Sequence, residues 1–109
     1  GGNGDDSIDG EAGNDLLTGM DGDDIVVGSF DDDTVLGGDG HDAVLGGSGD
    51  DIVLGGDGND TVRGHSGDDT VAGNQGVDIV NLVPDGTGTD SEQDETFVLD
   101  MDILLDLDL

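Results

Sequence analysis

The sequence predicts an all-β fold built from short strands joined by repeated turns, and three features of the chain predict it. The stretch GGDGHDAVLGGSGDDIVLGGDGNDTVRG, residues 37–64, repeats one nine-residue phrase three times. Each phrase carries glycines and an aspartate in its first six positions, which favours a tight turn. Each phrase ends in three residues with β-branched valine in the middle, and this favours a strand. Because segments that repeat at a fixed period stack on one another, we expect a solenoid.

The nine-residue register runs without insertion or deletion from Gly1 to Asn81. Position one is glycine in all nine repeats, and position four is glycine in eight, with Asp31 the exception. Position six is always aspartate: Asp6, Asp15, Asp24, Asp33, Asp42, Asp51, Asp60, Asp69 and Asp78. Position eight is always aliphatic: Ile8, Leu17, Val26, Val35, Val44, Val53, Val62, Val71 and Val80. Positions that are fixed in this way indicate one structural unit used nine times.

Composition limits the partners of this chain. It has 29 acidic residues and one basic residue, Arg63, so its formal net charge is −28. Such a chain repels nucleic-acid phosphates, and without lysine it has no phosphate-binding loop of the Walker type. No apolar run is long enough to span a membrane, and the absence of cysteine excludes disulfides and thiolate metal sites. We therefore expect no nucleic-acid partner and no membrane span, and the charge calls for a neutralising cation.

The residue types within each phrase fit a calcium-binding turn. Glycines at positions one and four are expected to take positive φ and turn their carbonyls inward, and the position-six carboxylate then closes a ring of oxygens. Calcium is a hard cation that takes about six to eight oxygen ligands, so carbonyls and carboxylates from two turns suit it. The position-eight side chain points into a narrow core, while positions seven and nine face outward.

The phrases resemble the nonapeptide GGxGxDxUx of the RTX (repeats-in-toxin) family over residues 1–81 of the 109. The resemblance implies a parallel β-roll, a right-handed solenoid in which six residues of each repeat form a calcium-binding turn and the last three form a strand. Two repeats then complete one coil, so odd and even repeats stack on opposite sides. Each site is expected between repeats i and i+2.

This geometry predicts about seven calcium sites, each with a pair of position-six carboxylates. The pairs are Asp6 with Asp24, Asp15 with Asp33, Asp24 with Asp42, Asp33 with Asp51, Asp42 with Asp60, Asp51 with Asp69, and Asp60 with Asp78. Turn carbonyls complete them, for example those of Gly1, Gly10, Gly19, Gly37, Gly46 and Gly55. Seven ions would halve the formal charge from −28 to −14. Since empty turns repel one another, calcium is expected to act as a folding cofactor.

Four residues depart from the pattern. Asp31 replaces the position-four glycine and is either a tolerated substitution or the mark of a weakened or extra-carboxylate site. His41 and His65 fall at positions five and two, in different phases of the repeat, so they predict surface turn residues and no transition-metal site. Arg63 falls at position nine and is expected to face outward.

Apolar residues also fall on the outer faces of the predicted strands. The even repeats contribute Leu16, Thr18, Thr34, Leu36, Ile52, Leu54, Thr70 and Ala72, and the odd repeats contribute Ile25, Val27, Ala43 and Leu45. These strips reflect either the ordinary β-propensity of exposed strands or a docking face for a sister rod or for another part of the protein.

Two further segments follow the repeats. Residues 82–95 predict an acidic loop, and residues 96–109 predict an amphipathic strand, because every odd position from Phe97 to Leu109 is apolar. The strand either caps the open end of the solenoid or adds to a partner's sheet. An acidic, aliphatic C-terminus is also similar to the uncleaved signal for type I secretion that RTX proteins carry.

The resemblance implies a calcium-triggered folding and stabilising module at the C-terminus of a secreted, extracellular bacterial protein that leaves the cell through a type I exporter. The alternative is a structural or adhesive module that self-associates through its outer strand faces or C-terminal strand. We expect no enzyme, because doublets such as Asp50–Asp51 recur in equivalent turns and form no single asymmetric pocket. Since Gly1 already opens a repeat, we expect a fragment whose catalytic activity, if any, lies in an upstream domain.

Overall fold

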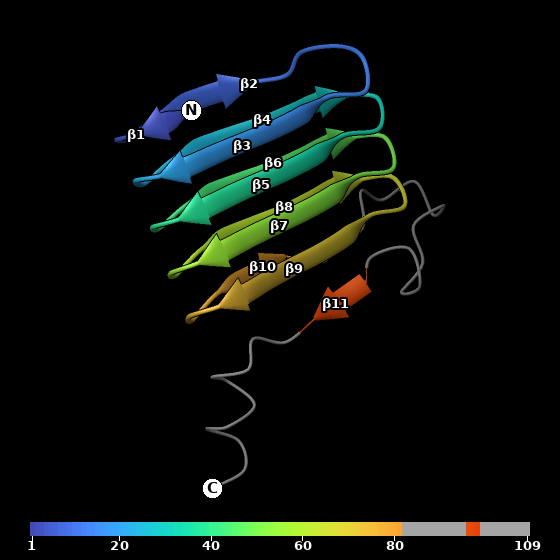
Figure 1. The fold of residues 1–109 in the computed structure, drawn as a ribbon. Helices are drawn as coiled ribbons and strands as arrows, with labels where there is room; N and C mark the ends of the chain where they lie inside the picture. The colour runs from blue at the N-terminus through green and yellow to red at the C-terminus, as the bar shows by residue number, and fades with distance from the viewer. Residues whose placement is uncertain (82–95, 99–109) are drawn as a thin grey trace, which may run out of the picture.

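The computed structural model describes residues 1–81 and 96–98, which form a coil of strands and turns without a helix (Figure 1). The strands are β1 (Gly2–Asn3), β2 (Ser7–Asp9), β3 (Leu16–Asp21), β4 (Ile25–Phe30), β5 (Thr34–Asp39), β6 (Ala43–Ser48), β7 (Ile52–Asp57), β8 (Thr61–Ser66), β9 (Thr70–Gln75), β10 (Ile79–Asn81) and β11 (Thr96–Val98). These residues include no helix that is long and apolar enough to cross a membrane.

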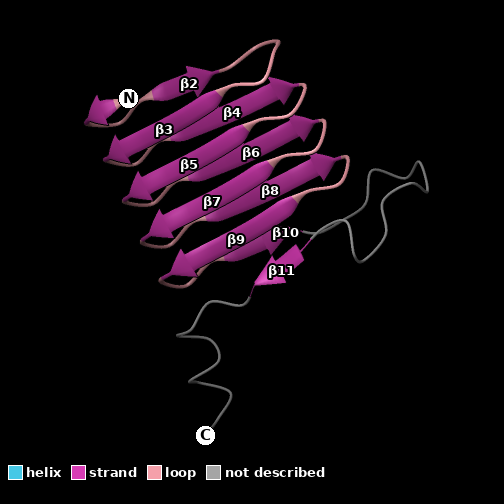
Figure 2. Cartoon of the chain, turned by 45° about the vertical axis from the view of Figure 1, so that its right-hand side comes forward, coloured by secondary structure: helices cyan, strands magenta, loops and turns pink. Residues whose placement is uncertain are grey.

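Successive strands alternate between two parallel sheets. The first sheet has the order β1-β3-β5-β7-β9-β11, and the second has the order β10-β8-β6-β4-β2. Each strand from β1 to β9 pairs with the strand two further along the chain, as Val35 of β5 pairs with Val53 of β7. One coil therefore holds two repeats, and odd and even repeats stack on opposite sides (Figure 2). The predicted all-β fold, a parallel β-roll, is confirmed.

The core is a single file of aliphatic side chains between the two sheets. The position-eight valines Val26, Val35, Val44, Val53, Val62 and Val71 are completely buried. Ile8 and Leu17, in the first two repeats, pack against this file and are partly buried. Burying a valine side chain contributes roughly 1.5–3 kcal/mol, so a core of one such residue per repeat is thin.

The strands are longer than the sequence predicts. Three-residue strands at positions seven to nine were expected, but β3 to β9 each have six residues and continue through positions one to three of the next repeat. Their pairing extends past the repeat boundary, where Met20 lies opposite Gly38 and Asp21 opposite Asp39. The turns shrink accordingly to positions four to six, because the backbone beyond position nine still finds a partner in the next coil.

The expected placement of positive φ is also wrong for position one. Positive φ occurs at positions two and four in all nine repeats, and no position-one glycine adopts it. Position two tolerates side chains there, including Met20 with φ of 82° and His65 with φ of 81°. At position four the requirement for glycine is steric as well, since a Cβ on Gly40 would collide with the Gly22 carbonyl of the preceding coil.

The C-terminal end of the described coil is marked by β11. This strand pairs in parallel with β9, with Thr96 opposite Thr70 and Val98 opposite Ala72, and it extends the first sheet by one strand. The predicted acidic loop at 82–95 and the remainder of the predicted strand at 99–109 lie outside the described residues.

Candidate metal sites in the turns

The position-six aspartates are enclosed by the roll. From Asp24 to Asp69 each is at most 3% exposed, and Asp78 is 9% exposed. A buried carboxylate is costly unless a cation or hydrogen bonds compensate it. The only basic side chain of the chain, Arg63, is exposed on the outer face of β8, so it does not meet this need.

In seven of these aspartates, Asp24 to Asp78 in steps of nine, one carboxylate oxygen accepts a hydrogen bond from the preceding coil. The Asp24 amide donates to Oδ1 of Asp42 at 2.8 Å, and the Asp42 amide donates to Oδ1 of Asp60 at 2.8 Å. Seven such bonds join Asp6 to Asp24, Asp15 to Asp33, Asp24 to Asp42, Asp33 to Asp51, Asp42 to Asp60, Asp51 to Asp69 and Asp60 to Asp78. The structure thus places the members of each pair expected from the sequence in adjacent coils, on the same side of the roll.

The second carboxylate oxygen, Oδ2, lacks a hydrogen-bond partner in seven aspartates. In Asp6, Asp15, Asp24, Asp33, Asp42, Asp51 and Asp60 the Oδ2 atom is buried and has no hydrogen-bond partner. A stranded buried acceptor costs roughly 1–3 kcal/mol, and more when it is charged. A repeated set of such oxygens fits the binding of a cation.

Each stranded oxygen faces a carbonyl of the next coil across a position-one glycine. A Cβ added to Gly55 would lie 2.6 Å from Oδ2 of Asp60 and 2.9 Å from the carbonyl oxygen of Gly73. The same two kinds of oxygen converge beside Gly10, where a Cβ would lie 2.8 Å from the carbonyl oxygen of Gly28. These oxygen-lined cradles have no room for a side chain, which explains why position one is always glycine although its φ is ordinary.

The cradles account for most, but not all, of the carbonyls proposed from the sequence. The carbonyls of Gly19, Gly37, Gly46 and Gly55 each face the cradle of the preceding coil, whereas Gly1 and Gly10 line the first two cradles with their α-carbons only. Equivalent carbonyls that the sequence list leaves out belong to Gly28, Gly64 and Gly73. All three are position-one glycines, so their place in the repeat was enough to identify them from the sequence.

Burial changes the protonation of the central carboxylates. Desolvation raises the pKa of Asp51 and of Asp60 to about 6, against a hydrogen bond from the preceding coil that lowers it. The pKa of Asp33 and that of Asp42 are raised for the same first reason. Neighbouring carboxylates add to the effect, such as Asp33 beside Asp51. The turns therefore hold negative charge that is unfavourable until a cation arrives.

The chemistry of these oxygens fits calcium. Carboxylate and carbonyl oxygens are the ligands of hard cations, and no nitrogen or sulfur takes part. Within residues 1–81 and 96–98 no group of three or more His, Cys, Asp or Glu side chains is arranged to hold a metal. An ion here would therefore depend on backbone carbonyls as much as on side chains.

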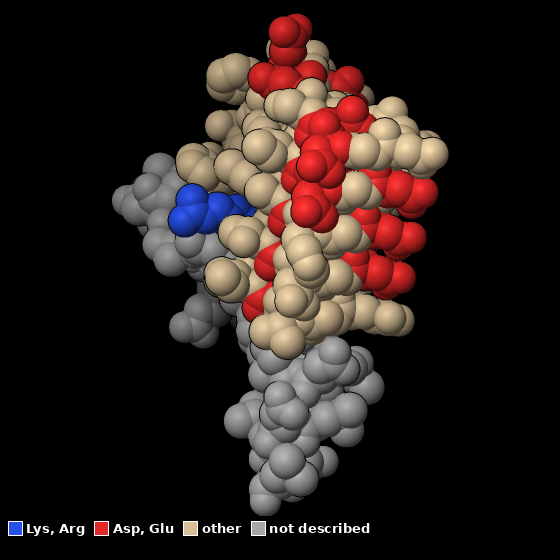
Figure 3. Space-filling view, turned by 90° about the vertical axis from the view of Figure 1, so that its left-hand side faces the viewer, with Lys and Arg blue, Asp and Glu red and all other residues tan. Residues whose placement is uncertain are grey.

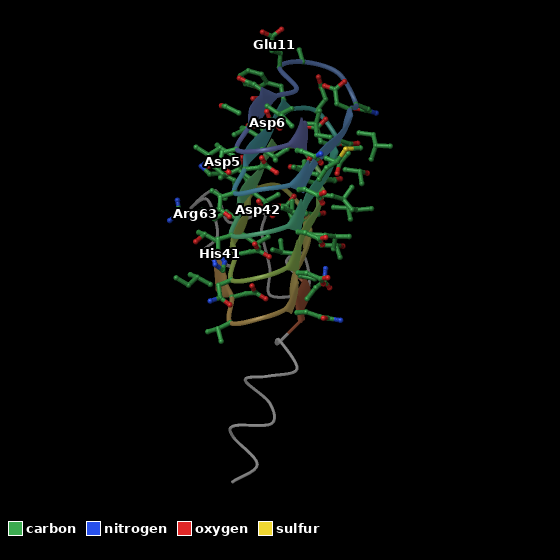
Figure 4. All side chains as sticks on the ribbon, turned by 60° about the vertical axis from the view of Figure 1, so that its left-hand side comes forward. Asp5, Asp6, Glu11, His41, Asp42 and Arg63 are labelled. Carbon is green, nitrogen blue, oxygen red and sulfur yellow. The ribbon has the colours of Figure 1, made fainter. Side chains whose placement is uncertain are left out.

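A second ladder, which the sequence analysis missed, runs beside the first. Position five, which the sequence analysis did not single out, carries a side-chain acceptor that receives the amide of position five in the next coil. The Asp23 amide donates to Oδ1 of Asp5, the His41 amide to Oδ1 of Asp23, and the Asn59 amide to Nδ1 of His41. Asp5 and His41 lie along the same edge of the roll (Figure 4). The signal was available, since eight of the nine position-five residues are Asp, Asn or His. The exception is Val77, in the last repeat, which has no following repeat in the register to accept from.

The irregular residues lie outside the cradles. Asp31 is exposed, and its Oδ2 accepts the Gly13 amide of the preceding coil at 3.0 Å. This bond, together with a φ of 76°, accounts for a substitution that leaves the buried Asp33 in place. His41 and Arg63 are exposed, as predicted. His65 is exposed too, but it lies within β8 and not in a turn as predicted, because the strands continue through position two of the next repeat.

Comparison with protein families agrees with the geometry. The family model described as RTX calcium-binding nonapeptide repeat (4 copies) matches residues 1–35, 18–53 and 45–80. The chain belongs to this RTX family. Its repeats therefore form a calcium-binding β-roll, a structural module rather than a catalytic one. No curated protein and no solved structure matches the chain.

Proposed function

We propose that this RTX roll is a calcium-triggered folding and stabilising module of a secreted bacterial protein. One observation carries the proposal: buried carboxylates such as Asp24 and Asp42 each keep an Oδ2 atom without a hydrogen-bond partner, facing a glycine carbonyl of the next coil. Calcium between the coils would neutralise these oxygens and bind only the folded state, so binding energy becomes folding energy.

A calcium titration followed by far-ultraviolet circular dichroism tests this function. The chain is expected to change steeply from coil to β-structure with calcium, and not with magnesium at equal ionic strength, because magnesium demands a tighter octahedral site. A chain that is folded without either ion, or that responds equally to both, would overturn the proposal.

The number of ions is part of the proposal. The position-six aspartates, Asp6 to Asp78 in steps of nine, form seven inter-coil pairs, so about seven calcium ions are expected and would reduce the formal charge from −28 to −14. Isothermal titration calorimetry and native mass spectrometry measure this stoichiometry directly. A value near two or three would restrict binding to a subset of the turns.

Secretion follows from the same coupling. In the low calcium of the cytosol the acidic chain stays unfolded and threads a type I exporter, and outside the cell it folds and cannot slip back. The midpoint of the calcium titration is then expected between the two environments, on the order of 10⁻⁴ to 10⁻³ M, as for extracellular calcium modules. A submicromolar midpoint would defeat this scheme, because the roll would already fold in the cytosol.

Self-association is the second candidate, and the exposed position-seven residues favour it. Leu16 is 73% exposed, Ile79 67%, Ile25 52% and Ile52 46%, and all four lie on outer strand faces. Light scattering after size exclusion in saturating calcium distinguishes the candidates. A strict monomer at high concentration would remove the support for an adhesive role, whereas dimers that Leu16→Ser and Ile52→Ser abolish would support it.

A further inference from the structure

Asp–Gly pairs recur along one edge of the roll. Asp21–Gly22, Asp39–Gly40 and Asp57–Gly58 occupy positions three and four of the third, fifth and seventh repeats, and Asn3–Gly4 has the same place in the first. All four lie at the odd turns, where their strands pair in register. The three aspartates are exposed, and Figure 3 shows acidic side chains gathered on this edge.

Among dipeptides that begin with aspartate, Asp–Gly is the one most open to backbone rearrangement, because glycine has no Cβ to shield its amide nitrogen. That nitrogen attacks the side-chain carboxyl carbon of the aspartate, loses its proton, and displaces the carboxyl oxygen as water. Water then adds to either carbonyl of the cyclic imide. One addition restores aspartate, and the other routes the main chain through the side chain as isoaspartate. The sum is an isomerisation that consumes no other reactant.

In the roll, the amide of each of these glycines donates a hydrogen bond to a carbonyl of the next coil. The Gly22 amide donates to the carbonyl of Asp39 at 3.0 Å, and the Gly40 amide donates to the carbonyl of Asp57 at 2.9 Å. The Gly58 amide is held in the same way by Gln75 at 3.1 Å. Each aspartate is also the last residue of a paired strand, so its backbone cannot turn toward the cyclic geometry without opening the coil.

We propose that Asp21, Asp39 and Asp57 are isoaspartate-forming sites whose reactivity is controlled by the coiling of the roll. In the calcium-free chain the glycine amides are released and the aspartates isomerise, whereas in the folded roll they are protected. An isoaspartate adds one backbone methylene at the end of a strand, which breaks the register with the next coil and prevents refolding. The inference rests on the proposed calcium-triggered folding.

The test compares ageing of the whole chain with and without calcium at neutral pH and 37 °C. Peptide mapping with fragmentation that distinguishes isoaspartate follows Asp39, and a synthetic peptide of residues 36–42 gives the unprotected rate. At Asp39 in calcium the reaction is expected to be at least about tenfold slower than in the peptide, because it requires local opening. Without calcium the two rates are expected to match.

Two results separate this inference from the proposed function. If circular dichroism shows folding with calcium but Asp39 still isomerises at the peptide rate, the inference is wrong and the function stands. If calcium induces no folding, the function itself fails.

A variant provides an independent readout. Replacing Asp21, Asp39 and Asp57 by glutamate keeps the charge but disfavours cyclisation, since the imide would need a six-membered ring. After ageing without calcium, the variant is expected to refold on calcium addition more completely than the wild-type chain, while unaged samples of both refold alike. Equal loss of refolding in the two aged chains would contradict the proposed damage.

Discussion

The Asp33 amide donates to Oδ1 of Asp51 across 2.8 Å, and Oδ2 of the same Asp51 carboxylate is buried without a hydrogen-bond partner. Half of the carboxylate thus serves the stacking of the coils, while the other half faces the position-one cradle. The roll without an ion is under electrostatic stress in the turns, since this arrangement recurs from coil to coil.

Neutralising one buried carboxylate should weaken calcium binding. Asp51→Asn keeps an oxygen for the Asp33 amide but removes the charge that faces the cradle, so the calcium midpoint for folding is expected to rise by about tenfold, equivalent to ~1.4 kcal/mol. Circular dichroism against calcium concentration measures it. Asp50→Asn is the matched control, because Asp50 is exposed and an asparagine there still accepts the Asp68 amide. Equal shifts in both variants would show that only net charge matters.

Adding a methyl group inside one cradle should also weaken the calcium-bound roll, and this substitution changes no charge. A Cβ at Gly46 would lie 2.5 Å from Oδ2 of Asp51 and 2.9 Å from the Gly64 carbonyl oxygen. Gly46→Ala is therefore expected to destabilise the calcium-bound roll by roughly 1–3 kcal/mol, as overpacking does. Thermal unfolding in calcium measures the loss. Ser48→Ala, at an exposed position two residues away, should leave the melting temperature nearly unchanged.

Acid should stabilise the calcium-free roll. The pKa of Asp51 and of Asp60 is about 6 in the fold, above the ordinary value of 3.8, so the folded state binds more protons than the unfolded state between these limits. Below about pH 4 both carboxyls are protonated in the folded and the unfolded state, so they do not lower the free energy of unfolding. Between about pH 4 and pH 6 they ionise more readily in the unfolded chain, so the free energy of unfolding falls as the pH rises. Without calcium, β-structure measured by circular dichroism is expected to increase from pH 7 toward pH 4.

Protonation of Asp51 and Asp60 should also weaken calcium binding. Because a protonated carboxylate is a poor ligand, the calcium concentration needed for folding is expected to rise as the pH falls below about 6. A calcium midpoint that stays constant between pH 7 and pH 5 would contradict the placement of ions at these carboxylates.

Arg63 offers a single-site proteolysis assay. It is the only Lys or Arg in the chain, so trypsin has one bond to cut, and that bond lies within β8 between β6 and β10. In calcium the paired strand must open before cleavage, and protection of at least about tenfold is expected. Gel electrophoresis of timed digests measures how fast the intact chain is converted into two fragments. Cleavage at equal rates with calcium and with magnesium would mean that residues around Arg63 do not fold on calcium.

Much of the fold could be predicted because a nine-residue period leaves few alternatives. The position-eight aliphatic residues become the core file, as with Val35 and Val53, since a strand alternates its faces. The resemblance to the RTX family supplied the two-repeat coil, and the pairing of Asp24 with Asp42 in adjacent coils follows from it.

What the sequence by itself determined is the repeat, its phase, the core file and the acidic turns. Only the tertiary structure decided the six-residue strands, the positive φ at position two, the position-one cradle and the partner of each position-five acceptor, such as the His41 amide for Asp23. Each of these depends on what lies eighteen residues away in the next coil, as with the Gly55 α-carbon beside the Gly73 carbonyl. Local propensity does not encode such contacts, because the separation between coils is set by hydrogen bonds that exist only once the coils have stacked.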